Sequence, residues 1–254
     1  MGQLQGRRAA ITAGAGGLGL VIAKLFRAAG ATVFVCDVDA AALAALPDGI
    51  AGARVDVASE AEVDGWLGPI VAEGIDILIN NAGIAGPTGL IEDLSLTDWR
   101  RCIEVVLDSQ FLCSRAVMPA MKKARAGAIV NLSSTAGIMG FPLRSPYCAA
   151  KYAVIGLTKT LAMEAGRDNV RVNAIAPGSI NGDRMARVIK AHAEADGITE
   201  DAVRRLYTEG TSMATFVDPE EIADMILYLV SDKGKRISGQ VIAVDGHTET
   251  LICR

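Results

Sequence analysis

The chain alternates between short apolar runs and longer segments in which apolar residues recur at helical spacing. Short runs rich in Val, Ile and Ala are typical of strands, and the longer periodic segments are typical of helices. The predicted strands are RRAAI (7–11), TVFVCD (32–37), ARVDV (53–57), IDILINNAG (75–83, running into a loop), AIVNLSS (128–134), VRVNAIAPG (170–178) and QVIAVDG (240–246). The predicted helices cover 17–29, 40–46, a segment capped at 59, 99–123, 147–167 and a segment capped at 218.

Three helix starts carry N-cap signals. Ser59 precedes Glu62 by three residues, which is the spacing of a capping box. The other two expected caps are Thr97, before the long helix 99–123, and Asp218, at the start of the motif DPEE.

The order of these elements predicts the fold class. Strands and helices alternate along the chain, and most strands are unbroken Val/Ile runs. Such strands are buried on both faces, which indicates a parallel sheet covered by helices on each side. We therefore expect an α/β fold with one doubly wound, Rossmann-type parallel sheet, forming a single domain over residues 1–254.

Composition and charge narrow the classes of function. Apolar residues make up 51% and charged residues 21% of the 254 residues, and the net charge is −4. This balance is that of a globular protein without the basic surface that a nucleic-acid partner requires. No apolar run reaches the roughly 18 residues of a membrane span. The five cysteines are scattered and lack metal-ligand spacing, which predicts reduced thiols in the cytoplasm and no metal site.

The stretch ITAGAGGLG (11–19) follows the first predicted strand and opens a predicted helix. Gly14, Gly16 and Gly19 satisfy G-x-G-x-x-G, a loop whose bare N–H groups and helix dipole attract a pyrophosphate. A plain flexible turn would have the same pattern. The next strand favours the dinucleotide interpretation, because it ends in Asp37, 18 residues beyond Gly19, where a carboxylate accepts hydrogen bonds from a ribose.

Asp37 also separates the two nicotinamide cofactors. A 2′-phosphate beside this carboxylate would suffer like-charge repulsion, and no Lys or Arg lies between Thr12 and Leu20 to offset it. We therefore expect NAD rather than NADP. The alternative for Asp37 is that it caps the helix that follows.

The stretch SPYCAAKYAV places Tyr147 and Lys151 four residues apart, on one face of a helix. An adjacent ammonium favours the phenolate form, and a shift of about three pKa units toward neutrality corresponds to roughly 4 kcal/mol. Ser134, which ends the strand AIVNLSS, is able to donate a hydrogen bond to a substrate oxygen. On its own, YxxxK is also compatible with an ordinary surface pair.

Taken together, these motifs resemble the short-chain dehydrogenase/reductase family. TAGAGGLG, Asp37, VDV with Asp56, NNAG (80–83), NLSS, Ser134 thirteen residues before Tyr147, YCAAK, NAIAPG and the closing ISGQVIAVDGH appear in family order over nearly the whole chain. The resemblance implies an NAD-dependent oxidoreductase that interconverts a secondary alcohol and a ketone. It also implies a homo-oligomer, a tetramer or a dimer.

The resemblance assigns roles to individual residues. It makes Tyr147 the acid–base catalyst, Lys151 the residue that lowers the pKa of Tyr147 and holds the nicotinamide ribose, and Ser134 the residue that positions the substrate oxygen. The implied cofactor-binding residues are Gly14, Ala15, Gly16, Gly17, Leu18, Gly19, Asp37, Asp56, Val57, Asn81, Ala82, Gly83, Tyr147, Lys151, Pro177, Gly178 and Ile180.

Two positions depart from the family pattern. Ala13 replaces the usual first glycine of the loop, which is tolerable if its φ is negative and Gly14 takes up the backbone strain. Val106, seven residues after Trp99, replaces an asparagine that in the family holds a water relaying protons to the lysine. We expect a lower turnover or proton exit through water alone, and nominate neither Asp108 nor Ser109 as a substitute.

The stretch 179–212 lies where the family carries a lid over its substrate. It contains Arg184 and Arg187, and Arg144 lies three residues before Tyr147. Arginines so placed clamp a carboxylate, phosphate or sulfonate, which favours a small anionic hydroxy compound such as a hydroxy acid, sugar acid or sulfonate. The alternatives are solvated or interface arginines and a neutral ketone, sugar or acyl substrate. A protein of another class, a nucleotide-binding subunit with little catalysis, has only Val106 in its favour.

Overall fold

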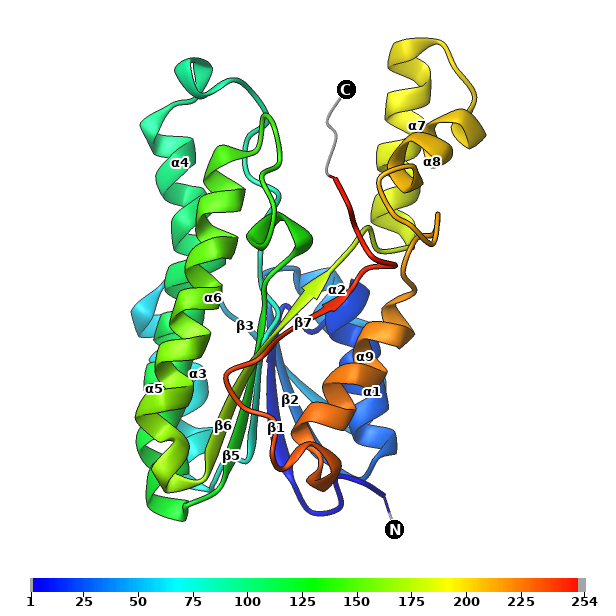
Figure 1. Cartoon of the computed structure of the whole chain (residues 1–254). Helices are drawn as coiled ribbons and strands as arrows, with labels where there is room; N and C mark the ends of the chain where they lie inside the picture. Colours follow the sequence, from blue (N-terminus) through cyan, green and yellow to red (C-terminus); the bar gives the residue numbers. More distant parts are fainter. Residues whose placement is uncertain (1, 251–254) are drawn as a thin grey trace.

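The computed structural model describes residues 2–250, without the side chains of residues 183, 184, 191, 192 and 195. Within them, parallel strands form one seven-stranded sheet in the order β3-β2-β1-β4-β5-β6-β7 (Figure 1). The strands are β1 Arg8–Thr12, β2 Thr32–Asp37, β3 Ile50–Arg54, β4 Ile77–Asn80, β5 Gly127–Leu132, β6 Val170–Pro177 and β7 Val241–Val244. The helices are α1 Gly17–Ala28, α2 Ala40–Ala44, α3 Glu60–Ala72, α4 Leu96–Ile103, α5 Ser109–Ala124, α6 Ser145–Ala165, α7 Asp183–Asp196, α8 Glu200–Thr208 and α9 Pro219–Val230.

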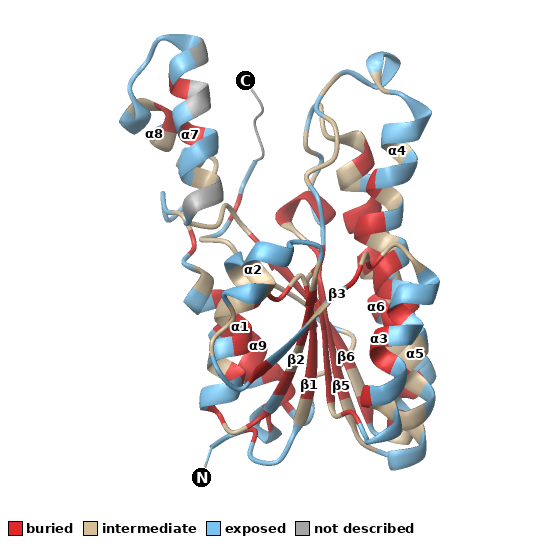
Figure 2. Cartoon of the chain, turned by 180° about the vertical axis from the view of Figure 1, so that it is seen from behind, coloured by how far each residue is buried: buried red, intermediate tan, exposed pale blue. Residues whose placement is uncertain are grey.

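The sheet is covered on both faces, which confirms the predicted doubly wound α/β fold. Helices α1 and α9 pack together on one face, and α3, α5 and α6 lie on the other (Figures 1 and 2). Each face has its own apolar core, since alternate side chains of each strand point to opposite sides. The central strands β1, β4, β5 and β6 are almost entirely buried and are coloured red in Figure 2, as expected for unbroken Val/Ile runs.

The strand order reverses between β1 and β4, and this reversal determines where a ligand is able to lie. The chain first builds outward from β1 to β3 and then resumes at β4 on the other side of β1. The connections that leave β1 and β4 therefore diverge at their carboxyl ends and leave room between them. Helices α4, α7 and α8 rise beyond this end of the sheet (Figure 1).

Several element boundaries differ from the predictions by a few residues, and two of these differences have a clear physical cause. Strand β3 covers Ile50–Arg54 rather than 53–57, because its ladder with β2 ends at Arg54 and only Val55 N–H follows, donating to Asp37 O at 3.0 Å. The valines of ARVDV are buried against the α3 side of the sheet rather than paired in it.

The long helix predicted for 99–123 is interrupted. Ser95, not Thr97, caps α4, since the Asp98 N–H donates to Ser95 Oγ. The helix then widens into a π-helical turn, η2 Glu104–Asp108, before α5 begins. Such a turn has i→i+5 backbone bonds and is often found at functional sites.

The other two capping signals have different outcomes. Asp218 and Glu221 form the predicted capping box. Ser59 caps α3, but the Glu62 carboxylate accepts the N–H of Asp56 at 2.8 Å. In a complete capping box the Glu62 carboxylate would accept the N–H of Ser59. Here it accepts an N–H of the turn that precedes the helix.

Helices α7 and α8 occupy most of the predicted lid stretch 179–212. Ile189, Ala193 and Val203 form a small apolar cluster between them, separate from the two clusters of the sheet. The pair stands apart from α4 and α6, on the opposite side of the carboxyl ends of the strands (Figures 1 and 2).

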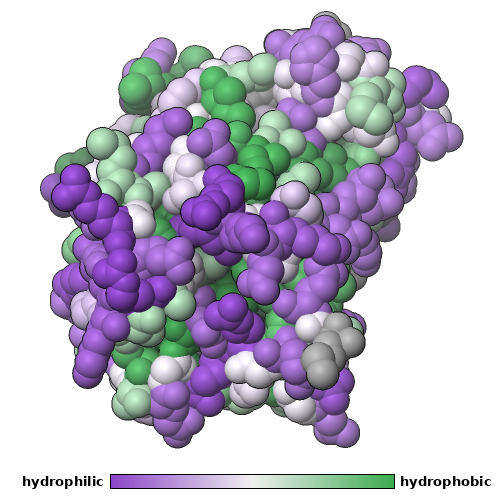
Figure 3. Space-filling view, turned by 60° about the horizontal axis from the view of Figure 1, so that its bottom comes forward, coloured by the Kyte–Doolittle hydropathy of each residue, from purple (hydrophilic) through white to green (hydrophobic). Residues whose placement is uncertain are grey.

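The opposite end of the molecule, at the amino ends of the strands, has a different character. Figure 3 shows mostly hydrophilic side chains on this face, with smaller hydrophobic areas between them. Arg7 pairs with Asp76 at 3.1 Å and Asp232 at 3.7 Å. These charges flank a cavity of about 100 Å³ whose lining also includes Arg171.

The first turn after β1 contradicts one expectation about Ala13. Its φ is +49°, so Ala13 itself has the left-handed conformation, whereas Gly14 has no positive φ. An L-residue with a Cβ in this region carries backbone strain of about 1–2 kcal/mol. The strain therefore lies on the residue where the family usually has glycine.

We expect Ala13→Gly to raise the free energy of unfolding by about 1 kcal/mol, because glycine adopts positive φ without the Cβ clash. Equilibrium denaturation in urea measures the change. Ala15→Gly is the matched control in the same loop, because Ala15 has no positive φ and is buried. The control should lose stability. A loss of stability in both variants would contradict strain at Ala13.

Candidate active site

The loop between β1 and α1 has the features of a phosphate cradle. Gly16 precedes α1 as its N-cap and offers no side-chain cap, so the first N–H groups of the helix have no side-chain acceptor from that residue. A Cβ at Gly16 or Gly17 would meet nothing within 4 Å, and both are exposed. These groups fit the pyrophosphate of a dinucleotide.

Two other glycines of the loop are needed for packing. A Cβ at Gly14 would lie 2.6 Å from Val35 Cβ, and one at Gly19 would collide with the Ala13 carbonyl and lie 2.7 Å from Asn81 Nδ2. The loop is therefore pressed against β2 and β4. Ala15 is buried and Leu18 half-buried, so of these loop residues Gly16 and Gly17 are the most accessible to a ligand.

The motif NNAG supports the loop from the neighbouring strand. Asn81 donates its side-chain amide to the carbonyls of Thr12 and Ala13, both at 3.0 Å, and Thr12 Oγ1 accepts the N–H groups of Asn81 and Ala82 at 2.9 Å. The Asn81 side chain thus holds the glycine loop. Gly83 is exposed, and a Cβ there would lie 3.7 Å from Lys151 Nζ.

Asp37 lies beside the glycine loop at the end of β2. Its carboxylate accepts the N–H groups of Ala15 and Asp39, both at 3.2 Å. The alternative that Asp37 caps α2 is wrong, because Asp39 caps that helix. Sequence reasoning missed Arg54, which is opposite Asp37 in the ladder and whose Nε donates to Val38 O at 3.4 Å; strand pairing was the signal that could have found it.

The next two predicted cofactor residues differ in exposure. Asp56 accepts Arg101 Nη2 at 3.0 Å and the Ala58 N–H at 3.0 Å. The Ala58 bond lowers the pKa of this carboxyl most, against desolvation, with help from Arg101. Val57 is buried. Arg101 was not anticipated, because it comes from α4, far along the chain.

Lys151 belongs to α6, and its side chain is anchored to the end of β5. Its side chain is buried, and Nζ donates to Leu132 O at 2.6 Å, while Ser133 Oγ donates to the Lys151 carbonyl at 2.9 Å. Desolvation lowers the pKa of Lys151 to about 8, slightly opposed by the Cys102 thiol. With this pKa the buried Lys151 side chain stays mostly protonated at neutral pH.

Tyr147 and Ser134 complete the predicted set. Lys151 Nζ lies 5.6 Å from the centre of the Tyr147 ring. The turn η3 Thr135–Gly137, which follows Ser134, packs against α6. Ser134 Oγ accepts the Ala136 N–H at 3.1 Å, which leaves its proton as a donor. The fold therefore brings the β5 end and the start of α6 together, as the motif order predicts.

Val106 lies in a small buried apolar cluster next to Tyr147. It is fully buried, packs in a cluster with Cys102, Ala150 and Tyr147, and its Cγ2 would lie 4.0 Å from a Cβ on Gly83. Asp108 is exposed, and desolvation raises the pKa of its carboxyl, followed by the nearby Glu104. Asp108 is therefore no substitute for the missing asparagine.

Arg144 is held next to Tyr147. Its guanidinium carbon lies 5.3 Å from the centre of the Tyr147 ring and 5.6 Å from that of Phe141, and Nη2 donates to Ala85 O at 2.5 Å. Its Nε is buried and has no hydrogen-bond partner among the described residues. Arg144 as a whole is half-buried, so its side chain is only partly open to solvent.

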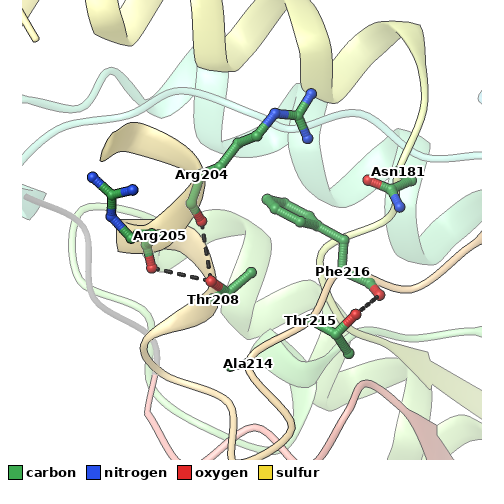
Figure 4. Close-up of a pocket in the computed structure, with 7 residues that line it drawn as sticks. All are labelled: Asn181, Arg204, Arg205, Thr208, Ala214, Thr215 and Phe216. Atoms are coloured by element: carbon green, nitrogen blue, oxygen red, sulfur yellow. Dashed lines mark hydrogen bonds between the residues drawn. The ribbon is translucent and has the colours of Figure 1, made fainter. Parts of the chain in front are cut away.

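The other two candidate arginines are on α7. Arg187 is exposed, and the side chain of Arg184 lies outside the described residues. Beside α8 there is a cavity of about 300 Å³ that the sequence did not indicate. It is lined by Asn181, Arg204, Arg205, Thr208, Ala214, Thr215 and Phe216. Figure 4 shows Arg204 extending past the Phe216 ring, which its guanidinium carbon approaches to 5.8 Å.

The remaining predicted cofactor residues come from the end of β6. Pro177 is buried, and the Gly178 N–H donates to Val244 O at 3.0 Å. A Cβ at Gly178 would lie 2.9 Å from Asp245 Cα, so this position requires glycine. Ile180 forms a bridge with Val217.

The described residues contain no group of three His, Cys, Asp or Glu side chains that could hold a metal ion. No helix in the same part of the chain is long and apolar enough to cross a membrane. Cys36, Cys102 and Cys113 are buried and Cys148 is half-buried, all as free thiols. Residues 251–254, with Cys253, lie outside the described range.

Comparison with known proteins agrees with this geometry. A family model described as enoyl-(acyl carrier protein) reductase matches residues 13–247. A D-beta-hydroxybutyrate dehydrogenase of Rhizobium meliloti is 33% identical over 94% of this chain and 97% of its own length. A 2-keto-3-deoxy-L-fuconate dehydrogenase of Xanthomonas campestris is 37% identical over 96% of this chain and 80% of its own. The crystal structure of a levodione reductase has a TM-score of 0.88 at 30% identity, with 96% and 97% of the two chains covered.

The buried ammonium predicts a pH-dependent stability. Because the pKa of Lys151 falls from 10.5 to about 8 on folding, the unfolded chain binds more protons between these values, and the free energy of unfolding rises with pH across this window. Lys151→Met removes the titration. We expect Lys151→Met to be more stable than wild type at the lower end of this window. The difference in free energy of unfolding should shrink by roughly 3 kcal/mol toward the upper end, as measured by denaturation at several pH values.

The exposed Lys159 of the same helix provides the control. The stability difference between Lys159→Met and wild type should stay flat across this window. A flat difference for Lys151→Met as well would show that the ammonium is not desolvated.

Proposed function

Because the chain belongs to the short-chain dehydrogenase/reductase family, whose members act on CH–OH groups with nicotinamide cofactors, we propose that it interconverts a secondary alcohol and a ketone with NAD. The observation that carries the proposal is the approach of the buried Lys151 ammonium to the Tyr147 ring, beside Ser134 at the end of β5. A purely nucleotide-binding protein has no need for a desolvated ammonium at that place.

Each of the three residues has a distinct task in this mechanism. Lys151, held by Leu132 O, favours the phenolate of Tyr147, which accepts the hydroxyl proton of the alcohol. Ser134 donates its remaining proton to the substrate oxygen and so orients it. A bound nicotinamide cofactor would supply the acceptor for the hydride of the alcohol carbon. In reduction, Tyr147 returns the proton to the carbonyl oxygen.

The choice of NAD rests on the charge at the end of β2. The Asp37 carboxylate is aligned by two N–H groups, one of them from the glycine loop itself. A carboxylate at this position would accept hydrogen bonds from the 2′- and 3′-hydroxyls of a ribose and would repel a 2′-phosphate, which supports NAD. Arg54 is exposed on the neighbouring strand and already interacts with Val38 O, so Asp37 is the nearer charge to the loop.

The substrate that we propose is a small hydroxy carboxylate. Two similar proteins are named for D-beta-hydroxybutyrate and 2-keto-3-deoxy-L-fuconate, both carboxylates. Arg144 supports an anion here, because it is a fixed cation at Tyr147 with a buried Nε that has no partner among the described residues. Helices α7 and α8 are the lid over this substrate, and the active protein is a cytoplasmic homo-oligomer.

We expect the purified protein to reduce NAD with D-beta-hydroxybutyrate or another hydroxy acid of a small panel, measured by NADH absorbance. The kcat/KM with NAD should exceed that with NADP at least about tenfold, since a 2′-phosphate would be repelled by Asp37. Tyr147→Phe should lower kcat by about a thousandfold, because it removes the proton acceptor.

Tyr152→Phe is the matched control for Tyr147→Phe, since Tyr152 is half-exposed on the same helix. It should keep the wild-type rate. NADH binding without turnover of any secondary alcohol would favour the nucleotide-binding alternative. A faster reaction with NADP would contradict the role of Asp37.

Arg144→Met tests the anionic substrate. A lost charge-assisted hydrogen bond is worth about 1.5–3 kcal/mol, so we expect KM for D-beta-hydroxybutyrate to rise roughly ten- to hundredfold. The methyl ester of the same acid has the same alcohol without the charge, and its KM should change little. Lys159→Met, at an exposed lysine of α6, should leave both unchanged. Equal increases for acid and ester would eliminate the clamp.

A further inference from the structure

The π-helical turn η2 is held by two side chains that follow it. Ser109 Oγ donates to Val105 O at 2.7 Å, and Gln110 Nε2 donates to Val106 O at 3.0 Å. Each side chain binds the carbonyl four residues earlier, the position that a backbone N–H serves in an α-helix. A π turn shifts the backbone bonds to i→i+5, so side-chain donors stabilise the carbonyls of this widened turn.

Gln110 makes one more contact, which Ser109 does not have. Its Nε2 also donates to Leu132 O at 3.3 Å, the carbonyl that accepts Lys151 Nζ at 2.6 Å. The amide has only one workable orientation, because the opposite one would bring Oε1 against two carbonyl oxygens. One amide group therefore joins the turn η2 to the acceptor of the catalytic lysine.

Burial of the Gln110 side chain lowers the stability of the fold. Gln110 is 1% exposed, and its Oε1 has no hydrogen-bond donor among the described residues. A buried acceptor without a partner costs roughly 1–3 kcal/mol. Packing alone would be served better by an apolar side chain of similar size, so the two bonds of Nε2 are the feature that distinguishes glutamine here.

We propose that Gln110 is a positioning residue for Lys151, which fixes the ammonium at its distance from Tyr147 by holding the Leu132 carbonyl against η2. The inference rests on the proposed roles of Tyr147 and Lys151. In this chain Val106 is apolar and its side chain packs with Tyr147, so it offers no polar group to the site. The inference assigns the polar support of Lys151 to Gln110 instead.

The charges around Tyr147 determine the direction of the expected effect. Arg144, just before α6, and Lys151, on α6, face it. Cys102 comes from α4, and burial raises the pKa of its thiol. Glu104 and Asp108, on η2, are exposed. Of the two cations, Lys151 is the one bound to Leu132 O. Loosening that carbonyl would let the ammonium move away from Tyr147, which would destabilise the phenolate and raise the pKa of Tyr147.

The test is the ultraviolet titration of the tyrosine phenolate, which requires no substrate. The spectrum of wild type minus Tyr147→Phe isolates Tyr147, and the same pair is measured in a Gln110→Met background. We expect Gln110→Met to raise the pKa of Tyr147 by roughly half a unit to one unit. The alkaline limb of kcat should move by the same amount.

Ser109→Ala is the matched control, because it removes the other side-chain bond of η2 without touching Leu132 O. It should leave the Tyr147 titration in place even if it lowers stability. If Gln110→Met does not fold, Gln110→Asn retains an amide on a shorter side chain and should shift the titration in the same direction by less.

Superimposable titrations of wild type and the folded Gln110 variant would overturn the inference, as would an equal shift in Ser109→Ala. These outcomes are separable from failure of the proposed function. A wild-type protein without dehydrogenase activity contradicts the function, whereas an active wild type with an unshifted Gln110 variant contradicts only the role of Gln110.

Discussion

The interaction on which the site depends is the hydrogen bond from the buried Lys151 ammonium to the carbonyl of Leu132. A charge with 4% of its surface exposed is stable only if the protein replaces its water with aligned acceptors. At the end of β5, the Leu132 carbonyl accepts from Nζ. Ser133 Oγ donates to the backbone carbonyl of Lys151 and so ties α6 to the same strand end. Tyr147 and Ser134 are then positioned by the two segments, α6 and the β5 end, that this lysine joins.

A chain of buried polar groups beneath the site holds those segments in register. Asn131, inside β5, accepts Asn80 Nδ2 of β4 at 2.8 Å and donates to Thr158 of α6 at 2.9 Å. Buried amides in a parallel sheet are stable only when such partners exist, and in return they specify one arrangement of the elements around them. The first asparagine of NNAG therefore serves the core, while the second serves the glycine loop.

Local signals predicted the fold well, because the unbroken apolar strands, the helix periods and the glycine loop are all short-range. These local signals predicted the structure less well where tertiary contacts compete with local preferences. The Thr97 signal did not cap α4, because Ser95 began the helix two residues earlier. Ala13 took a positive φ, because the turn is pressed between β2 and Asn81, which left the strain on that residue rather than on Gly14.

The sequence by itself determined the sheet and its helices, and placed Gly16, Asp37, Ser134, Tyr147 and Lys151 at the ends and starts of elements that must meet at one edge. This follows because parallel strands share the direction of their carboxyl ends. Only the tertiary structure showed that Arg144 lies against Tyr147, that Arg101 pairs with Asp56, and that Gln110 reaches the carbonyl holding Lys151. Those contacts join residues from different elements, and no spacing along one segment encodes the distance between two side chains that packing brings together.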